Sequence, residues 1–176
     1  TGLSTNPNDG FAGTIDGNSF DNLNIIIASS AAGDSLTGRD AAATWNLGST
    51  YQYVSTNTLT FSNVEDLVGG SASDTFAFLG STVFTGTLEG GAGAGNDSLN
   101  YAGYASAVTI DIGTGVATGL SGTFSGIETL TGSPAASDTL IGTSGDDTFA
   151  ITSSNAGTVG GYAFTSFENL NGAAGA

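Results

Sequence analysis

The chain has 176 residues, with sixteen acidic side chains, a single arginine and no lysine or histidine, so its formal net charge is −15. A chain without a cationic surface is not expected to bind nucleic acid or an anionic membrane. The absence of cysteine excludes disulfides and thiolate metal sites. No apolar run reaches the roughly 18 residues of a membrane span, so membrane insertion is not expected.

Short strand-length segments follow one another along the chain. Residues 23–27, 75–79 and 148–151 are rich in β-branched or aromatic side chains, which favour strands. Residues 107–112 alternate apolar and polar side chains with the period of two that a half-buried strand shows. No stretch keeps a helical period over a dozen residues. The sequence therefore predicts an all-β protein, with glycine-rich turns at 69–70, 90–95 and 160–161.

One seven-residue segment, which opens with Phe and closes with an aliphatic residue, occurs four times. Its copies begin at Phe20, Phe61, Phe124 and Phe164, so the spacings are 41, 63 and 40 residues and the period is about 104. A fixed internal period indicates similar units that stack on one another. We expect a single continuous repeat region over 1–176, with copy one at about 1–73, a linker at 74–104 and copy two at about 105–176.

The two copies also match in the character of their side chains. At an offset of 104, Trp45 falls on Phe149, as expected if each copy offers its apolar face to a shared core. Because no β-hairpin signal accompanies the repeats, they favour a parallel β-solenoid, like a β-helix or β-roll, whose turns of chain stack about 4.8 Å apart. A β-sandwich array is the structural alternative.

Acidic residues recur in one context: small residues or glycine, then Asp, then Ser or Thr, then an apolar residue. Glycine permits left-handed backbone, Asp faces outward at the turn, and the apolar residue two places later points into the core. The aspartates in this context are Asp34, Asp74, Asp97, Asp138 and the pair Asp146 and Asp147.

This motif resembles the repeats-in-toxin (RTX) nonapeptide, Gly-Gly-x-Gly-x-Asp-x-apolar-x. Residues 93–99 match it well, and 142–150 and 69–76 match it in part. The resemblance implies parallel β-rolls that bind Ca²⁺ at their turns, in the manner of large bacterial surface proteins and adhesins. It makes Ca²⁺ the candidate cofactor, with Asp34, Asp74, Asp97, Asp138, Asp146 and Asp147 as candidate ligands.

The chain also departs from the RTX pattern. No run exceeds two consecutive units, and Ala43 stands in copy one where copy two has Asp147. One Asp at each turn cannot build the cage of six to eight oxygens that Ca²⁺ takes. The alternative interpretation is that each Asp caps its turn by accepting hydrogen bonds from backbone N–H groups.

Three glutamates, Glu65, Glu128 and Glu168, occupy equivalent places in the repeats, with Asn24 in the fourth. We interpret them as solvated or N–H-bonded repeat residues. The repeated Phe residues, with Trp45, are interpreted as core side chains rather than as platforms for sugars.

The residue types in the chain limit the classes of function that it can have. Without His, Cys or Lys, general acid–base, thiol and Schiff-base chemistry have no side chains to use, so neither an enzyme nor catalytic residues are expected. The first hypothesis is a rigid, acidic structural segment of a bacterial extracellular or cell-surface protein: a stalk, a surface layer or a self-assembled filament. The second is a calcium-dependent adhesin or carbohydrate-binding module, or the RTX tail of a secreted enzyme.

The expected partners follow from the same pattern. Residues 172–176 correspond to 69–73, where the pattern continues into Asp74. We expect the end of one chain to stack on the start of the next, giving a homo-oligomer or filament. Surface glycans are the other candidate partner.

Overall fold

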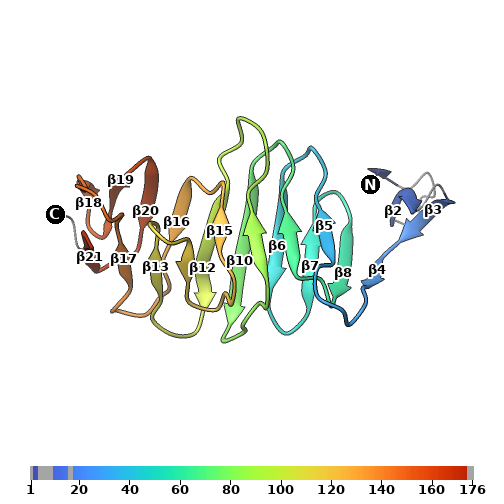
Figure 1. The fold of residues 1–176 in the computed structure, drawn as a ribbon, viewed down its shortest axis with the longest axis horizontal. Coiled ribbons are helices and arrows are strands. Elements are labelled where there is room, and N and C mark those ends of the chain that lie inside the picture. Colours follow the sequence, from blue (N-terminus) through green and yellow to red (C-terminus); the bar gives the residue numbers. More distant parts are fainter. Residues whose placement is uncertain (1, 4–9, 16–17, 174–176) are drawn as a thin grey trace.

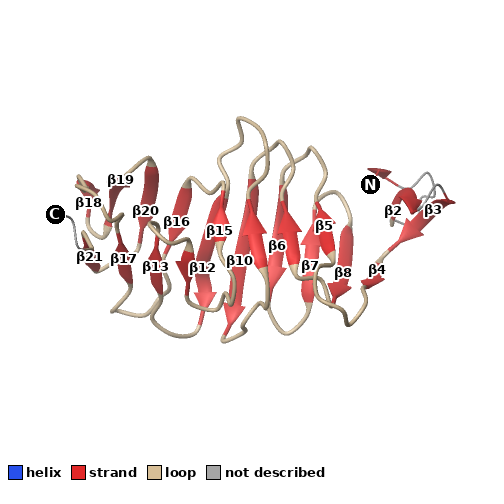
Figure 2. Cartoon of the chain, viewed as in Figure 1, coloured by secondary structure: helices blue, strands red, loops and turns tan. Residues whose placement is uncertain are grey.

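A computed structural model describes residues 2–3, 10–15 and 18–173. Every regular element in this part of the chain is a strand (Figure 2), so the all-β prediction is confirmed. Within the described ranges, no helix is long and apolar enough to cross a membrane. The strands lie side by side across the long axis of the molecule, and the two ends of the chain lie at opposite ends of that axis (Figure 1).

Ten strands form one long sheet, in the order β18-β19-β20-β16-β12-β10-β6-β7-β8-β4. Parallel pairs join β4 to β8, β6 to β10, β10 to β12, β12 to β16 and β16 to β20. The strands are β4 (Ile25–Ile27), β6 (Ala43–Leu47), β7 (Tyr51–Val54), β8 (Thr58–Ser62), β10 (Asp74–Gly80), β12 (Ser98–Tyr104), β16 (Thr129–Thr131), β18 (Ala150–Ser153), β19 (Ala156–Val159) and β20 (Tyr162–Thr165).

Three smaller sheets complete the fold. The second sheet has the order β15-β11-β9-β5, the third β14-β13-β17-β21, and the N-terminal sheet β1-β2-β3. Their strands are β1 (Gly2–Leu3), β2 (Phe11–Ile15), β3 (Asn18–Leu23), β5 (Ser35–Thr37), β9 (Asp66–Val68), β11 (Thr87–Glu89), β13 (Thr109–Asp111), β14 (Val116–Ala117), β15 (Phe124–Ser125), β17 (Thr139–Ile141) and β21 (Asn169–Asn171).

The expectation that the repeats lack hairpins is wrong. Strands β6, β7 and β8 form an antiparallel meander inside the long sheet, and β18, β19 and β20 form another. Three expected strands also differ in their bounds. The segment 23–27 is divided at Asn24 between β3 and β4. Of 107–112 only β13 is extended and paired, and β18 begins at Ala150, after Phe149.

The two copies of the repeat have the same strand pairing. Strands β4 and β5 lie 104 residues before β16 and β17, and each pairs in parallel with the same kind of partner: Leu36 faces Leu67, and Leu140 faces Leu170. The third residue of each seven-residue segment has left-handed backbone, with φ between 55° and 62°. These residues are Asn22, Asn63, Gly126 and Ser166.

The core follows the inner face of the sheets along the whole stack. Trp45 is fully buried and stacks on Phe76 of the neighbouring strand, with ring centroids 5.8 Å apart. Phe78 stacks in the same way on Tyr101 at 4.6 Å. Such pairs add about 0.5–1.5 kcal/mol each to the burial of their area. The interpretation of the aromatic residues as core side chains therefore holds for those that are buried: Trp45, Phe61, Phe76, Phe78, Phe124 and Phe164. Phe20 and Phe149, included in the same interpretation, are only half-buried.

Candidate functional site

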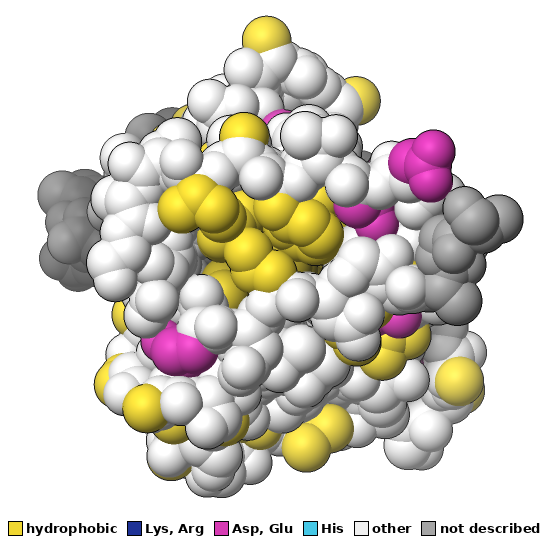
Figure 3. Space-filling model, turned by 90° about the vertical axis from the view of Figure 1, so that its left-hand side faces the viewer, with side chains coloured by type: hydrophobic (Ala, Val, Ile, Leu, Met, Phe, Trp, Pro, Cys, Tyr) yellow, Lys and Arg dark blue, Asp and Glu magenta, His cyan; other side chains and the backbone are white. Residues whose placement is uncertain are grey.

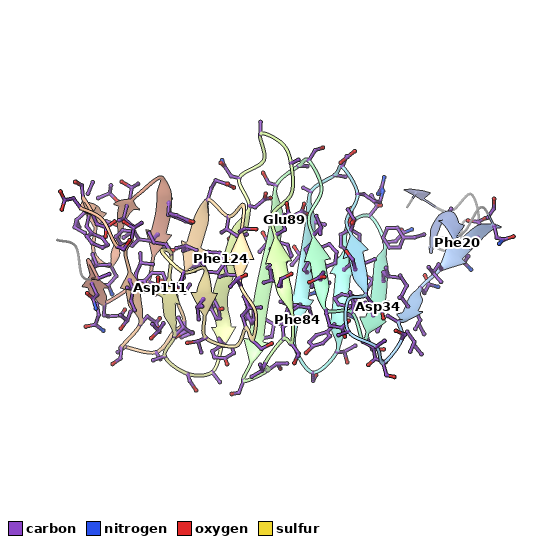
Figure 4. The ribbon with its side chains drawn as sticks, viewed as in Figure 1. Phe20, Asp34, Phe84, Glu89, Asp111 and Phe124 are labelled. Atoms are coloured by element: carbon purple, nitrogen blue, oxygen red, sulfur yellow. The ribbon has the colours of Figure 1, made fainter. Side chains whose placement is uncertain are left out.

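The aspartates singled out by the sequence lie where turns lead into strands. The expectation that they face outward is wrong for three of them, which are buried. Asp74 is 1% exposed, Asp97 5% and Asp138 0%. A buried carboxylate is costly unless hydrogen bonds compensate for the water it has lost. The partners of these side chains therefore decide what they do. Asp34, a further aspartate of this set, is labelled in Figure 4.

Within its own turn, each of Asp74, Asp138 and Asp147 accepts a hydrogen bond from the backbone just upstream. The Gly70 N–H donates to Asp74 Oδ2 at 2.7 Å, and the Ser133 N–H donates to Asp138 Oδ2 at 2.6 Å. Ser133 Oγ adds a further bond to Asp138, at 2.8 Å to Oδ1. Asp147, which is half-buried, receives the Thr143 N–H at 2.9 Å. The turn-capping interpretation is thus realised at these three aspartates.

The same carboxylates also join neighbouring strands. The Asp74 N–H donates to Asp97 Oδ1, and the Val108 N–H donates to Asp138 Oδ1, both at 2.7 Å. In each pair, the donor precedes or begins a strand, and the acceptor precedes its parallel neighbour. The Asp138 side chain therefore both closes its own turn and holds the adjacent turn in register.

The repeated glutamates make the equivalent bond at the other strand pairs. Glu65 accepts the Asp34 N–H at 3.1 Å, Glu128 the Asp97 N–H at 2.8 Å, and Glu168 the Asp138 N–H at 2.9 Å. The interpretation of these glutamates as N–H-bonded repeat residues is confirmed. We call the set the carboxylate ladder; its members are Glu65, Asp74, Asp97, Glu128, Asp138 and Glu168.

Glycines make room for the ladder. A Cβ placed on Gly69 would lie 2.8 Å from Asp74 Oδ2, one on Gly90 would lie 2.5 Å from Asp97 Oδ2, and one on Gly132 would lie 2.7 Å from Asp138 Oδ2. Real Cβ atoms essentially never come that close to another atom. Each glycine directly follows a strand and lies five to seven residues before its aspartate. The sequence contains this glycine–aspartate spacing. Its packing role is not predicted by the resemblance to the RTX motif, which associates the same residues with calcium.

Burial sets the protonation of two members of the ladder. It raises the pKa of the Asp74 carboxyl above its ordinary 3.8, and the nearby Asp97 raises it further, against the Gly70 and Ala43 N–H groups. Burial likewise raises the pKa of Asp97, with Glu128 adding to the effect and the Asp74 N–H opposing it. Asp74 Oδ1 is buried without a hydrogen-bond partner in the described part of the chain. The ladder therefore holds two carboxylates that are costly to ionise.

We expect the chain to become more stable as the pH falls through the raised pKa values of Asp74 and Asp97 towards 3.8. Between 3.8 and the raised pKa values, the folded state binds more protons than the unfolded state, so the free energy of unfolding decreases as the pH rises through that window. Urea unfolding at a series of pH values measures the slope. The double variant Asp74→Asn/Asp97→Asn should flatten it, and an unchanged slope would contradict the role assigned to these two groups.

The candidate calcium ligands are not all alike. Asp34 is half-buried and receives the Ser29 hydroxyl at 2.7 Å, whereas Asp146 is exposed to solvent. Among the residues that the structure describes, no three acidic side chains are grouped so that they could hold a metal ion. Calcium binding at these aspartates stays a prediction.

The chain is thus an all-β protein whose neighbouring strands are joined by carboxylates, of which Asp74, Asp97 and Asp138 are buried. No family model, curated protein or solved structure matches it. Its function therefore has to be argued from the geometry of its strands and side chains.

Proposed function

We propose that the chain is a structural shaft: a parallel β-solenoid that serves as a stalk, surface layer or filament outside a bacterial cell. The observation that carries the proposal is the carboxylate ladder, which joins turn to turn along the stack. Together with the backbone bonds between strands, it links each layer to the next. A rod bonded in this way resists bending, because bending must stretch hydrogen bonds.

The surface chemistry fits this role. A net charge of −15 keeps copies soluble through mutual repulsion. The absence of cysteine and methionine suits a surface exposed to oxidants. These features support an extracellular location.

The end of the stack formed by β18 and β21 supports end-to-end association. Ile151 is 60% exposed and Leu170 36%, whereas their counterparts in copy one, Leu47 and Leu67, are fully buried. In copy one these positions lie beneath β10 and β11; in copy two they lie on β18 and β21, the last strands of their sheets. Figure 3 shows an apolar hollow in this end of the molecule. We propose that a second copy stacks there and continues the sheets.

The strand directions allow such a stack. Strands β4 and β18 are the two edges of the long sheet, and the succession of parallel and antiparallel pairs makes them run the same way. A head-to-tail contact would thus pair β18 with β4 in parallel. Such a contact does not close on itself and gives an open filament.

Fibre diffraction tests the solenoid. We expect a reflection at about 4.8 Å along the fibre axis, because the strands lie across that axis. Electron microscopy should show rods whose length grows by whole copies. A string of globular beads without the axial reflection would favour the β-sandwich array instead.

Association through the end is tested separately. Ile151→Glu should abolish oligomers seen by light scattering at high protein concentration, because it places a charge in the hollow. Val83→Glu is the matched control, since Val83 is also exposed, at 56%, but lies between β10 and β11, which are interior strands of their sheets. Equal association of both variants would contradict stacking at this end.

A further inference from the structure

An open groove of about 580 Å³ lies on the outer side of the long sheet, beside the turn between β6 and β7. Asn46 and Gln52 face each other across these two strands, and Leu79 of β10, 37% exposed, lies beside them. Ser49, Thr50 and Ser81 complete the polar wall. The volume is within the ~300–1,000 Å³ of ordinary small-molecule sites.

A second depression of about 390 Å³ adjoins the first and shares Thr50 and Thr82 with it. Its aromatic wall is Tyr51, which is only half-buried. The Tyr51 hydroxyl donates to the Val83 carbonyl at 3.1 Å, and its ring packs against Phe61 and Phe84. The ring is therefore held in place before any ligand arrives.

The side chains that line the groove and the adjoining depression determine which class of ligand can bind there. All these side chains are uncharged, in a protein of net charge −15. No carboxylate is there to hold a cation, and the overall charge repels anions. Each amide offers two donors and an acceptor, and each hydroxyl offers both functions. Within the described residues, no hydrogen bond of the protein occupies the Asn46 or Gln52 side chain.

We propose that this groove binds a neutral oligosaccharide. The amides and hydroxyls match the adjacent hydroxyls of a sugar, while Leu79 in the groove and Tyr51 in the adjoining depression provide apolar surface for its C–H faces. Binding needs no calcium, because no acidic side chain lines the groove. The inference goes beyond the structural role and does not depend on the stack being a solenoid.

The test titrates isotope-labelled protein, in a chelator, with cellotetraose, maltotetraose and mannotetraose, and with tri-galacturonate as the anionic probe. The side-chain amide signals of Asn46 and Gln52 should shift and saturate with at least one neutral sugar. Asn46→Asp keeps the size of the side chain but removes two donors, and should weaken binding about tenfold. Asn100→Asp on β12 is the matched control, since Asn100 lies outside the groove, and should leave affinity unchanged.

Three outcomes would overturn the proposal: no saturable shift with any neutral sugar, a response to tri-galacturonate as strong as to the neutral sugars, or a requirement for calcium. Equal weakening by both variants would place binding elsewhere and overturn it as well. The location of the shifts in the unmodified protein does not depend on how the variants fold.

Discussion

Replacing Asp138 by Ala should lower the free energy of unfolding by about 3–5 kcal/mol. The carboxylate is fully buried and accepts bonds from the Val108 N–H, the Ser133 N–H and the Ser133 hydroxyl. Its removal leaves these buried donors without a hydrogen-bond partner, which costs about 1–3 kcal/mol for each unsatisfied group. Equilibrium unfolding in urea measures the difference.

Asp146→Ala is the matched control for this experiment. Asp146 lies eight residues further on in the same kind of motif, but its side chain is exposed, so the substitution should change stability by no more than about 0.5 kcal/mol. Both measurements are repeated in calcium and in a chelator. If the two variants lose similar stability, and only in calcium, the aspartates act as ligands and the packing role is refuted.

The residue types of the ladder could be predicted from the sequence, but its connections could not. The equivalent places of Glu65, Glu128 and Glu168 already suggested N–H-bonded repeat residues, and their bonds confirm it. Each bond, however, joins residues 30 or 31 positions apart. Local pattern cannot supply such a pairing, because it depends on which strands become neighbours.

Neighbouring strands also explain why equivalent aspartates differ in burial. Asp34 corresponds to Asp138 in the repeat, yet Asp34 is half-buried and Asp138 fully buried. Strand β17, after Asp138, has β13 on its outer side, whereas β5, after Asp34, is the edge of its sheet. The absence of a covering strand, not the local sequence, leaves Asp34 accessible.

The missed hairpins had a local signal. Gly160 and Gly161 both have positive φ, 56° and 93°, and connect β19 to β20 in two residues. A Gly-Gly pair between strands is a recognised hairpin turn. The sequence predicts a glycine-rich turn at 160–161 but no hairpin, because the 104-residue repeat favours parallel stacking. In copy one the equivalent turn, 55–57, is a residue longer and lacks glycine, so only one copy carries the signal.

Replacing Gly90 by Ala should be as damaging as losing Asp138, with a loss of about 3–5 kcal/mol or a failure to fold. A Cβ at this position would collide with the Gly126 carbonyl oxygen and lie 2.5 Å from Asp97 Oδ2. The carbonyl belongs to the backbone of the next turn, and Asp97 is held by the Asp74 N–H, so neither can move aside cheaply. Overpacking costs about 1–3 kcal/mol, and loss of the Asp97 bond adds a similar amount.

Gly145→Ala tests whether a glycine is required because it belongs to the RTX-like motif or because it leaves space beside a carboxylate. Gly145 stands in the glycine position of the RTX-like segment, yet a Cβ there would meet nothing closer than Thr143 Oγ1 at 3.7 Å. It should be neutral or stabilising by about 0.4–1 kcal/mol, because alanine restricts the unfolded chain. Thermal unfolding of the two variants, with and without calcium, decides between the two roles. If Gly145→Ala is damaging and Gly90→Ala is tolerated, the glycines serve the turn motif rather than the space beside the carboxylates.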